Sequence, residues 1–421
     1  MTQLIRAIGR WDFVALFINS IVGAGIFGLP SRVHALIGSY SIFAYLLCAG
    51  LVLLIIFCFA EIGSRFSTTG GPYLYATEAF GPFVGFQVGW LVWLARITAF
   101  AALANLLIDY LGYFFPQAAQ PAVRAAVISS VVLALTVLNL LGVRQGAVVA
   151  DIFTIGKIVP MTLFVCVGLF FIEPANLKLP PHVEHSDFSA AMLLLVFAFT
   201  GFEAAVIPAA EIHDPQRTVP FGALVSLMVI APLYVLIQVV CTGTLTGLAE
   251  SSRPLADAAD AFIGPVGGAL MAATALVSVT GTLNGIVLAA PRLLFAMAER
   301  KQLPAPLAAV HQRFRTPAVA IIVTSCVILV VTLSGSFVTT VAIATLTRLF
   351  AFAATCAAVP VMRRRGADTA AFRMPGGMFT VALALVLIAW LVLSSSMREA
   401  ISVAIAMAVG LALLGAMRWV K

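Results

Sequence analysis

Charged residues are scarce in this chain. Asp, Glu, Lys and Arg make up 10% of the sequence, whereas hydrophobic residues make up 62%. An ordinary soluble domain is about a quarter charged and about half apolar, so a water-soluble globular protein is excluded. Long runs such as 41–60, 91–107, 122–141, 158–172 and 222–242 are nearly charge-free over about the length that spans hydrocarbon. These runs predict membrane helices.

The sequence also lacks the usual marks of metal sites and hydrolytic enzymes. It has no CxxC pair, no HExxH motif and no GxSxG motif. Its six cysteines all fall inside apolar runs, without a His at ligand spacing, and are interpreted as small core residues. We therefore expect no metal, no cofactor and no enzymatic activity.

The apolar runs predict an all-α, polytopic membrane protein with about twelve transmembrane helices. No segment between them is long enough to bury a separate soluble core. The expected spans lie near residues 12–31, 39–64, 82–112, 122–142, 147–172, 188–211, 221–247, 262–299, 317–335, 338–362, 377–396 and 399–418.

The net charge of +7 is explained by sidedness rather than by a nucleic-acid partner. With the N-terminus in the cytoplasm, sixteen Lys and Arg residues fall in inner loops and tails, and five fall in outer loops. This asymmetry is typical of a bacterial-type inner-membrane protein with both termini in the cytoplasm. The five outer residues are Arg32, Arg124, Lys178, Arg253 and Arg398.

Two spans contain signals that interrupt a helix. The first holds Gly23, Gly25, Gly28 and Pro30 within eight residues, and the sixth holds Thr200-Gly201 followed by Pro208. Backbone groups freed at such a break cannot face lipid, so the broken segments are expected to line a binding site enclosed by protein. Matching breaks five spans apart are typical of inverted-repeat transporters. The alternative is that the glycines only allow close helix packing.

The break in the first span suits one kind of ligand. The helical half that follows Gly23–Gly25 offers unpaired N–H groups and a positive dipole end to a carboxylate. The carbonyl groups before the break suit an ammonium group. An α-amino acid carries both groups on adjacent atoms, so the backbone alone favours an amino acid as substrate.

Several motifs, in order along the chain, resemble the amino acid–polyamine–organocation superfamily of permeases. The resemblance covers most of the chain, and the loop from the second to the third span is its most specific part. The matching segments are Gly23-Ala24-Gly25-Ile26-Phe27, Ala60-Glu61-Ile62, Gly70-Gly71-Pro72-Tyr73-Leu74-Tyr75, Phe80-Gly81-Pro82, Phe199-Thr200-Gly201-Phe202-Glu203 with Glu211, Asp214-Pro215-Gln216-Arg217-Thr218-Val219-Pro220, Asn284 through Arg292, Met297-Ala298 and Leu303-Pro304.

The resemblance implies a leucine-transporter-like core of two inverted five-helix repeats, in which helices 1 and 6 are broken. The first repeat would cover residues 1–172 and the second 186–362, with two peripheral helices in 373–421. Ala24 stands where the family carries a Ser or Thr hydroxyl. Phe197 stands at a position that, in arginine/agmatine-type exchangers, looks like a Trp that stacks on the substrate. A Phe at this position argues against a guanidinium ligand. The implied substrate contacts are Ile21, Gly23, Ala24, Gly25, Phe197, Ala198 and Thr200.

Two charged residues inside spans are candidates for coupling and gating. Lys157 matches a lysine that, in related proton-coupled permeases, resembles a substitute for a sodium ion between helices 1 and 8. Its protonated amine could donate to the open carbonyls of helix 1, and the alternative is a permanently charged strut. Glu203 resembles a gating acid of the family, and the alternative is a satisfied structural carboxylate.

Arg96 and Arg348 are two arginines that lie well inside spans. Arg96, in the third span, could bind a second carboxylate of the ligand, or it could pair with Glu203 or Asp109. We favour the ion pair, and we interpret Arg348 as structural. Glu61, near the inner surface, is explained by snorkelling.

The predicted function is secondary active transport of amino acids by alternating access. We expect it to be proton-coupled and sodium-independent, with neutral amino acids favoured. An amino acid/amine or polyamine exchanger is the alternative. The partners would be the amino acid, protons and the lipid bilayer, with no nucleic acid, and the protein would be a monomer or a homodimer.

Overall fold

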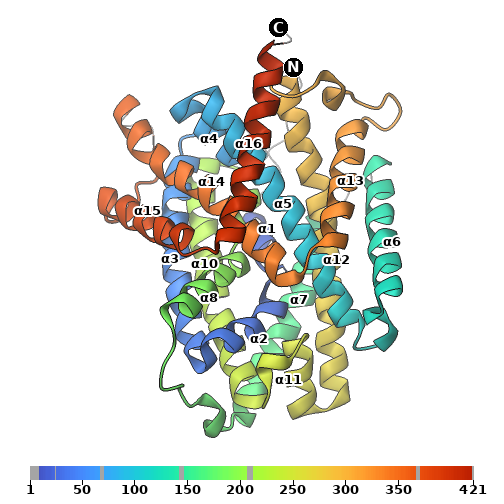
Figure 1. The fold of residues 1–421 in the computed structure, drawn as a ribbon. Helices are drawn as coiled ribbons and strands as arrows, with labels where there is room; N and C mark the ends of the chain where they lie inside the picture. The colour runs from blue at the N-terminus through green and yellow to red at the C-terminus, as the bar shows by residue number, and fades with distance from the viewer. Residues whose placement is uncertain are drawn as a thin grey trace.

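The structure is a computed structural model, and it describes residues 9–23, 25–66, 71–141, 147–205, 212–366 and 370–419. Helices make up most of this part of the chain (Figure 1). The α-helices are α1 (Arg10–Ile21), α2 (Gly25–Ile37), α3 (Ser41–Gly63), α4 (Gly71–Phe80), α5 (Pro82–Leu111), α6 (Pro121–Leu140), α7 (Ala147–Gly168), α8 (His185–Ala198), α9 (Phe202–Ala205), α10 (Pro215–Thr244), α11 (Pro254–Ile263), α12 (Pro265–Glu299), α13 (Ala318–Ser334), α14 (Phe337–Arg365), α15 (Gly377–Leu393) and α16 (Met397–Trp419).

Within the described residues, seven helical stretches are long and apolar enough to cross a membrane. They are Gly25–Gly63, Pro82–Leu111, Pro121–Leu140, Pro215–Thr244, Pro265–Glu299, Phe337–Arg365 and Met397–Met417. Four shorter apolar helices accompany them, at Gly156–Phe171, His185–Ala198, Ala318–Ser334 and Gly377–Leu393. The chain is therefore a polytopic helical membrane protein. One of the seven stretches, Gly25–Gly63, contains two helices, α2 and α3. The number of about twelve spans stays a prediction.

Proline marks the start of five of these helices. Pro82, Pro121, Pro215, Pro254 and Pro265 occupy the first turns of α5, α6, α10, α11 and α12. A proline fits there because the first N–H groups of a helix have no partner within it. Two of the short helices, α4 and α11, fall in segments that the sequence indicated as connections between spans.

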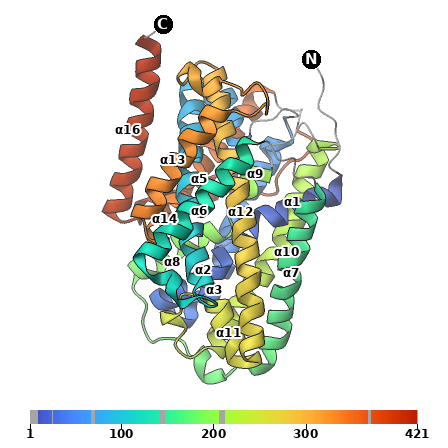
Figure 2. The ribbon, with the colours of Figure 1, turned by 90° about the vertical axis from the view of Figure 1, so that its right-hand side faces the viewer.

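Burial separates a central helix from peripheral ones. In α5, 94% of the most apolar window is buried, against 22% in α6 and 17% in α16. The central helix α5 packs against α14, α12, α4 and α13. Figure 2 shows α16 at the edge of the bundle. The low burial of α6 and α16 leaves apolar side chains free to face lipid.

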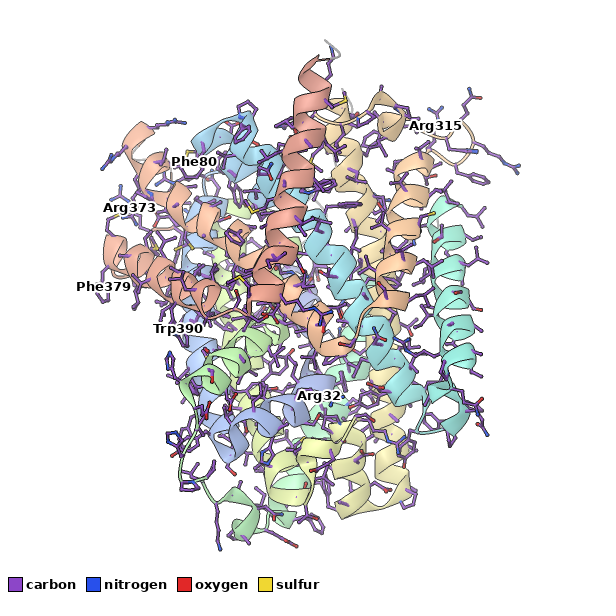
Figure 3. The ribbon with its side chains drawn as sticks, in the orientation of Figure 1. Arg32, Phe80, Arg315, Arg373, Phe379 and Trp390 are labelled. Atoms are coloured by element: carbon purple, nitrogen blue, oxygen red, sulfur yellow. The ribbon has the colours of Figure 1, made fainter. Side chains whose placement is uncertain are left out.

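The broken helices lie beside the centre, and their halves pair with one another. Packing joins α2 to α8, and α1 to the short helix α9. Figure 3 shows Arg315, between α12 and α13, and Arg373, between α14 and α15, toward one end of the bundle. Arg32, on α2, lies in the opposite half. The sequence assigned the first two to one side of the membrane and Arg32 to the other.

Candidate functional site

The first span is interrupted where the sequence predicted. Helix α1 ends at Ile21, and α2 begins at Gly25. Between them the chain bends, and the Gly23 N–H donates to the Ile21 carbonyl oxygen at 2.7 Å. Ala24, which the resemblance implied as a substrate contact, lies outside the described residues. The predicted break in helix 1 is confirmed.

The sixth span is interrupted in the same way. Helix α8 ends at Ala198 and α9 begins at Phe202. Gly201 has a φ of +117°, a conformation that side chains with a Cβ rarely adopt. The Thr200 hydroxyl donates to the Phe197 carbonyl oxygen at 2.8 Å, so it caps the end of α8. The predicted break in helix 6 is also confirmed.

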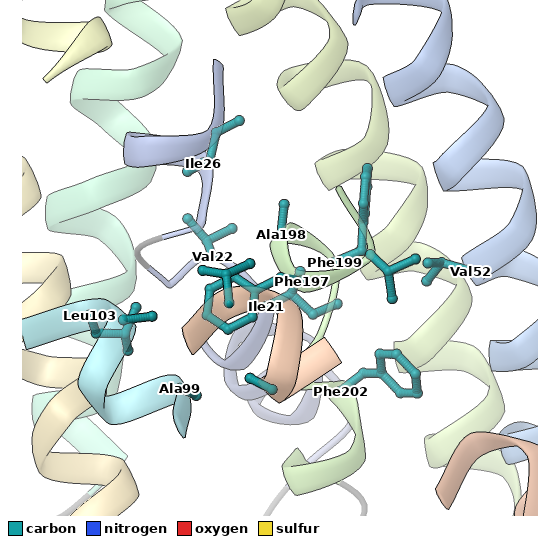
Figure 4. Close-up of a cluster of buried hydrophobic side chains, with 14 of the residues drawn as sticks. Ile21, Val22, Ile26, Val52, Ala99, Leu103, Phe197, Ala198, Phe199 and Phe202 are labelled. Atoms are coloured by element: carbon teal, nitrogen blue, oxygen red, sulfur yellow. The ribbon is translucent and has the colours of Figure 1, made fainter. Parts of the chain in front are cut away.

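The two breaks rest against each other through glycine. A Cβ added to Gly25 would lie 2.8 Å from the Cα of Ala198, and a Cβ on Gly201 would overlap the Ser20 carbonyl oxygen. The backbones approach so closely only because neither position carries a side chain. Figure 4 shows residues of both breaks in one cluster, with Ile21 beside Phe197 and Ala198. The implied substrate contacts that the structure describes therefore lie together.

These contact residues are almost fully enclosed. Ile21, Phe197, Ala198 and Thr200 are 2%, 6%, 1% and 7% exposed, respectively. Helices interrupted at such depth leave backbone donors and acceptors that lipid cannot satisfy. The partners must come from the protein or from a ligand.

Lys157 on α7 binds the end of α1. Its Nζ lies 2.5 Å from the Val22 carbonyl oxygen and 3.1 Å from the Asn19 carbonyl oxygen. Its side chain is almost fully buried. The last carbonyl groups of a helix have no partner within it, and a cation is favoured there by the helix dipole. The expectation that Lys157 donates to open carbonyls of helix 1 is confirmed.

Two hydroxyl groups bind neighbouring carbonyls of the same break. The Tyr234 hydroxyl, from α10, donates to the Ile21 carbonyl oxygen at 3.2 Å. The Ser278 hydroxyl, from α12, lies 3.4 Å from the Gly23 carbonyl oxygen. Helices α7, α10 and α12 thus hold the end of α1 in its bent conformation. Sequence reasoning missed Tyr234 and Ser278, because Tyr and Ser within apolar helices are common and carry no positional signal.

Glu203 closes the break in helix 6. Its Oε2 accepts a hydrogen bond from the Gly201 N–H at 2.8 Å, and its Oε1 accepts one from Arg348 Nε on α14 at 3.0 Å. The Arg348 guanidinium also lies over the Phe197 ring, with 5.6 Å from its central carbon to the ring centre. Both carboxylate oxygens are bound, which matches the structural alternative for Glu203. A gating role stays a prediction.

Arg96 does not form the ion pair that we favoured from the sequence. Glu203 pairs with Arg348 instead, and Arg96 takes part in none of the ion pairs between described residues. Arg96 is buried on α5, and its Nη2 has no hydrogen-bond partner. It still lies within electrostatic reach of Glu203 and Arg348. The prediction was wrong because sequence spacing cannot show which of two arginines on different helices reaches an acid.

The comparison with known proteins decides the family. A family model described as amino acid permease matches residues 8–414, nearly the whole chain. The chain belongs to the amino acid permease family. The superfamily predicted from the motifs is thereby confirmed, and members of the family are membrane transporters rather than enzymes.

Three relatives are similar to this permease over about three quarters of its length. It is 32% identical to a serine/threonine exchanger of Bacillus subtilis, over 76% of this chain and 74% of that protein. It is 28% identical to an arginine/agmatine antiporter of Chlamydia abortus, over 76% and 70%. It is 27% identical to a methylthioribose transporter of Bacillus subtilis, over 75% and 72%.

A second polar cluster of the permease lies at the end of α3. The Glu61 side chain is fully buried and receives two hydrogen bonds from Arg363 on α14, at 2.7 and 2.6 Å. Its Oε2 also accepts the Met374 N–H at 3.1 Å, and Arg65 Nη2 lies 3.5 Å from Oε1. The snorkelling interpretation of Glu61 was wrong, because this carboxylate is enclosed by partners and does not reach water.

The described part of the permease contains no group of three or more His, Cys, Asp or Glu side chains that could hold a metal ion. Its cysteines are free thiols; Cys166 and Cys326 are exposed and the other four are buried. The expectation that all six are core residues therefore fails for these two, which lie on outward faces of α7 and α13.

Proposed function

We propose that this permease is a secondary active transporter that carries amino acids by alternating access. The supporting observation is the mutual contact of two interrupted helices, deep in the protein, with their carbonyl groups held by Lys157, Tyr234 and Ser278. Paired breaks of this kind are where inverted-repeat transporters bind substrate.

The two halves of the break would bind the two charged groups of an amino acid. The N–H groups at the start of α2 have no partner within the helix and would bind the α-carboxylate. A carbonyl oxygen has two lone pairs, so the Gly23 carbonyl can accept from Ser278 and still bind the α-ammonium group, whereas the Ile21 carbonyl already accepts from Tyr234 and from the Gly23 N–H. In this arrangement the shared part of the substrate is recognised by the backbone at Gly23 and Gly25.

We propose twelve transmembrane helices in two inverted five-helix repeats, residues 1–172 and 186–362, with peripheral helices in 373–421. The placement of positive residues supports cytoplasmic termini and a bacterial inner membrane as the location. Oligomeric state is a monomer or a homodimer under this proposal.

Lys157 is proposed as the coupling residue. Its amine lies against the carbonyls of α1, where a sodium ion would otherwise compensate their partial negative charge. A protonated Lys157 holds the break, and loss of the proton removes its charge and weakens these hydrogen bonds, because a neutral amine is a poorer donor. Proton movement then accompanies a change in the shape of the site, and sodium is not required.

Uptake into proteoliposomes tests the transport proposal. Protein reconstituted with an inward proton gradient should accumulate an amino acid, and Gly25→Val should abolish both uptake and ligand-induced thermal stabilisation, because its side chain would enter the space of Ala198. Gly285→Ala is the matched control, since its Cβ would meet nothing within 4 Å. Uptake by Gly25→Val at the wild-type rate would contradict the proposal.

A separate measurement tests coupling. Replacing sodium with choline should leave uptake unchanged, and Lys157→Ala should lose accumulation driven by the proton gradient. Dependence of uptake on sodium would refute the role of Lys157.

An amino acid/amine or polyamine exchanger is the second candidate, because two of the similar proteins are by name an exchanger and an antiporter. The discriminating assay is counterflow. Labelled amino acid that enters only when the vesicles are preloaded with an amine or a second amino acid, without response to the proton gradient, would favour exchange.

A further inference from the structure

Arg96 is a buried cation without a counter-ion of its own. Arg96 is 7% exposed, and its Nη2 is buried without a hydrogen-bond partner. An unpaired charge is costly to bury, and inside a membrane protein such residues usually mark a substrate or ion pathway. We therefore expect a bound ligand to supply the anion that pairs with this guanidinium.

The position of Arg96 along α5 relates it to the broken helix 1. Residues three or four apart lie on one face of a helix, so Arg96 shares a face with Ala99 and Leu103, and this face continues to Tyr110. Ala99 and Leu103 belong to the buried cluster that contains Ile21, Val22 and Phe197 (Figure 4). The Tyr110 hydroxyl donates to the Phe27 carbonyl oxygen of α2 at 2.7 Å. The face of α5 that carries Arg96 thus follows the proposed substrate site.

Arg348, on the neighbouring helix α14, adds a second free donor. Its Nε is bound to Glu203, but its Nη1 is buried without a partner. Glu203 has both oxygens engaged, by the Gly201 N–H and by Arg348. The guanidinium groups of Arg96 and Arg348 carry two positive charges and the Glu203 carboxylate carries one negative charge, so one positive charge is in excess. The unpaired donors and the excess charge both call for an anion.

We infer that Arg96, together with the free Nη1 of Arg348, binds a second carboxylate on the substrate, so that the permease selects acidic amino acids. This inference rests on the proposed function and names its substrate class. The α-carboxylate and α-ammonium groups of the substrate bind the backbone at the break in helix 1, and its side-chain carboxylate binds the guanidinium groups of Arg96 and Arg348. It replaces the preference for neutral amino acids expected from the sequence.

The chemistry explains why a neutral side chain is a poor substitute. A guanidinium presents a fork of N–H donors that matches a carboxylate, and charge-assisted hydrogen bonds are stronger than neutral ones. A ligand that lacks the matching group leaves the donors unpaired, and such sites reject it strongly. Glutamate and glutamine, or aspartate and asparagine, are nearly the same size, so any preference within a pair reports the charge.

The test is competition for uptake in proteoliposomes, with glutamate, aspartate, glutamine and asparagine as competitors. We expect wild-type protein to take glutamate or aspartate over the matching amide by roughly tenfold or more, the range of a hydrogen bond to a charged group. Arg96→Gln should lose this preference and retain uptake of the amide. Arg292→Gln is the matched control, because exposed Arg292 donates to the Leu288 carbonyl of its own helix and takes no part in the site.

The outcomes separate the inference from the proposed function. Wild-type protein that transports neutral amino acids and ignores glutamate and aspartate overturns the acidic subsite and leaves amino acid transport standing. Protein that transports none of the twenty amino acids overturns the proposed function itself. If Arg96→Gln fails to fold, thermal stabilisation of the wild type by glutamate against glutamine decides the matter, and equal stabilisation contradicts the inference. Stabilisation by chloride or phosphate alone would contradict the inference, because the guanidinium groups would then bind an inorganic anion rather than an amino acid carboxylate.

Discussion

The contact between Gly201 and α1 gives a sharp test of the site. Gly201 has a φ of +117°, and a Cβ there would overlap the Ser20 carbonyl oxygen. The change Gly201→Ala therefore introduces backbone strain and forces two backbones apart. Strained residues cost about 1–3 kcal/mol and overpacking about 1–3 kcal/mol, so we expect a loss of about 2–6 kcal/mol in unfolding free energy.

The assay is thermal unfolding of purified protein in detergent, followed by uptake in proteoliposomes. We expect Gly201→Ala to melt several degrees lower than wild type and to lose uptake. Gly285→Ala is again the control, because an alanine in open space on a helix should be neutral or stabilising by up to about 1 kcal/mol. A Gly201→Ala protein with the melting temperature and uptake of this control would refute the packing of the two breaks.

Two further changes test the buried ion pairs. Glu203→Gln leaves the Arg348 guanidinium without its counter-ion, so we expect a loss of about 3–5 kcal/mol in stability, partly restored by a second change, Arg348→Met, in thermal unfolding. Glu61→Gln weakens two short hydrogen bonds from Arg363, each worth about 1.5–3 kcal/mol when charged. The partial exposure of Arg363 reduces the net effect, and an unchanged melting temperature would show that the pair contributes nothing.

The backbone features of the site could be predicted from the sequence. Glycine and proline weaken a helix through their own backbones, so the breaks at Gly23–Gly25 and at Thr200–Gly201 could be predicted from the chain itself, although Gly28 and Pro30 lie inside α2. Lys157 was singled out as a charge inside an apolar span that needs a partner, and its place beside the carbonyls of helix 1 was implied by the family resemblance. Only the prediction of the breaks depends on local chemistry alone.

The pairing of side chains between helices could not be predicted. Glu203 pairs with Arg348 and not with Arg96, although both arginines lie inside spans. Glu61 likewise joins α3 to Arg363, about three hundred positions away in the chain. Which groups meet depends on helix rotation and depth, and spacing along one helix does not determine these across a bundle.

The crossed contacts at the two glycines also bear on how the protein can move. Gly201 touches α1, and Gly25 touches the end of α8, so each half of one broken helix is matched to a half of the other. We expect a swing of α1 to take α9 with it, while α2 and α8 stay together as a separate couple. Access from one face of the membrane would then depend on α1 and α9, and access from the other face on α2 and α8. The bends between α1 and α2 and between α8 and α9 would act as hinges.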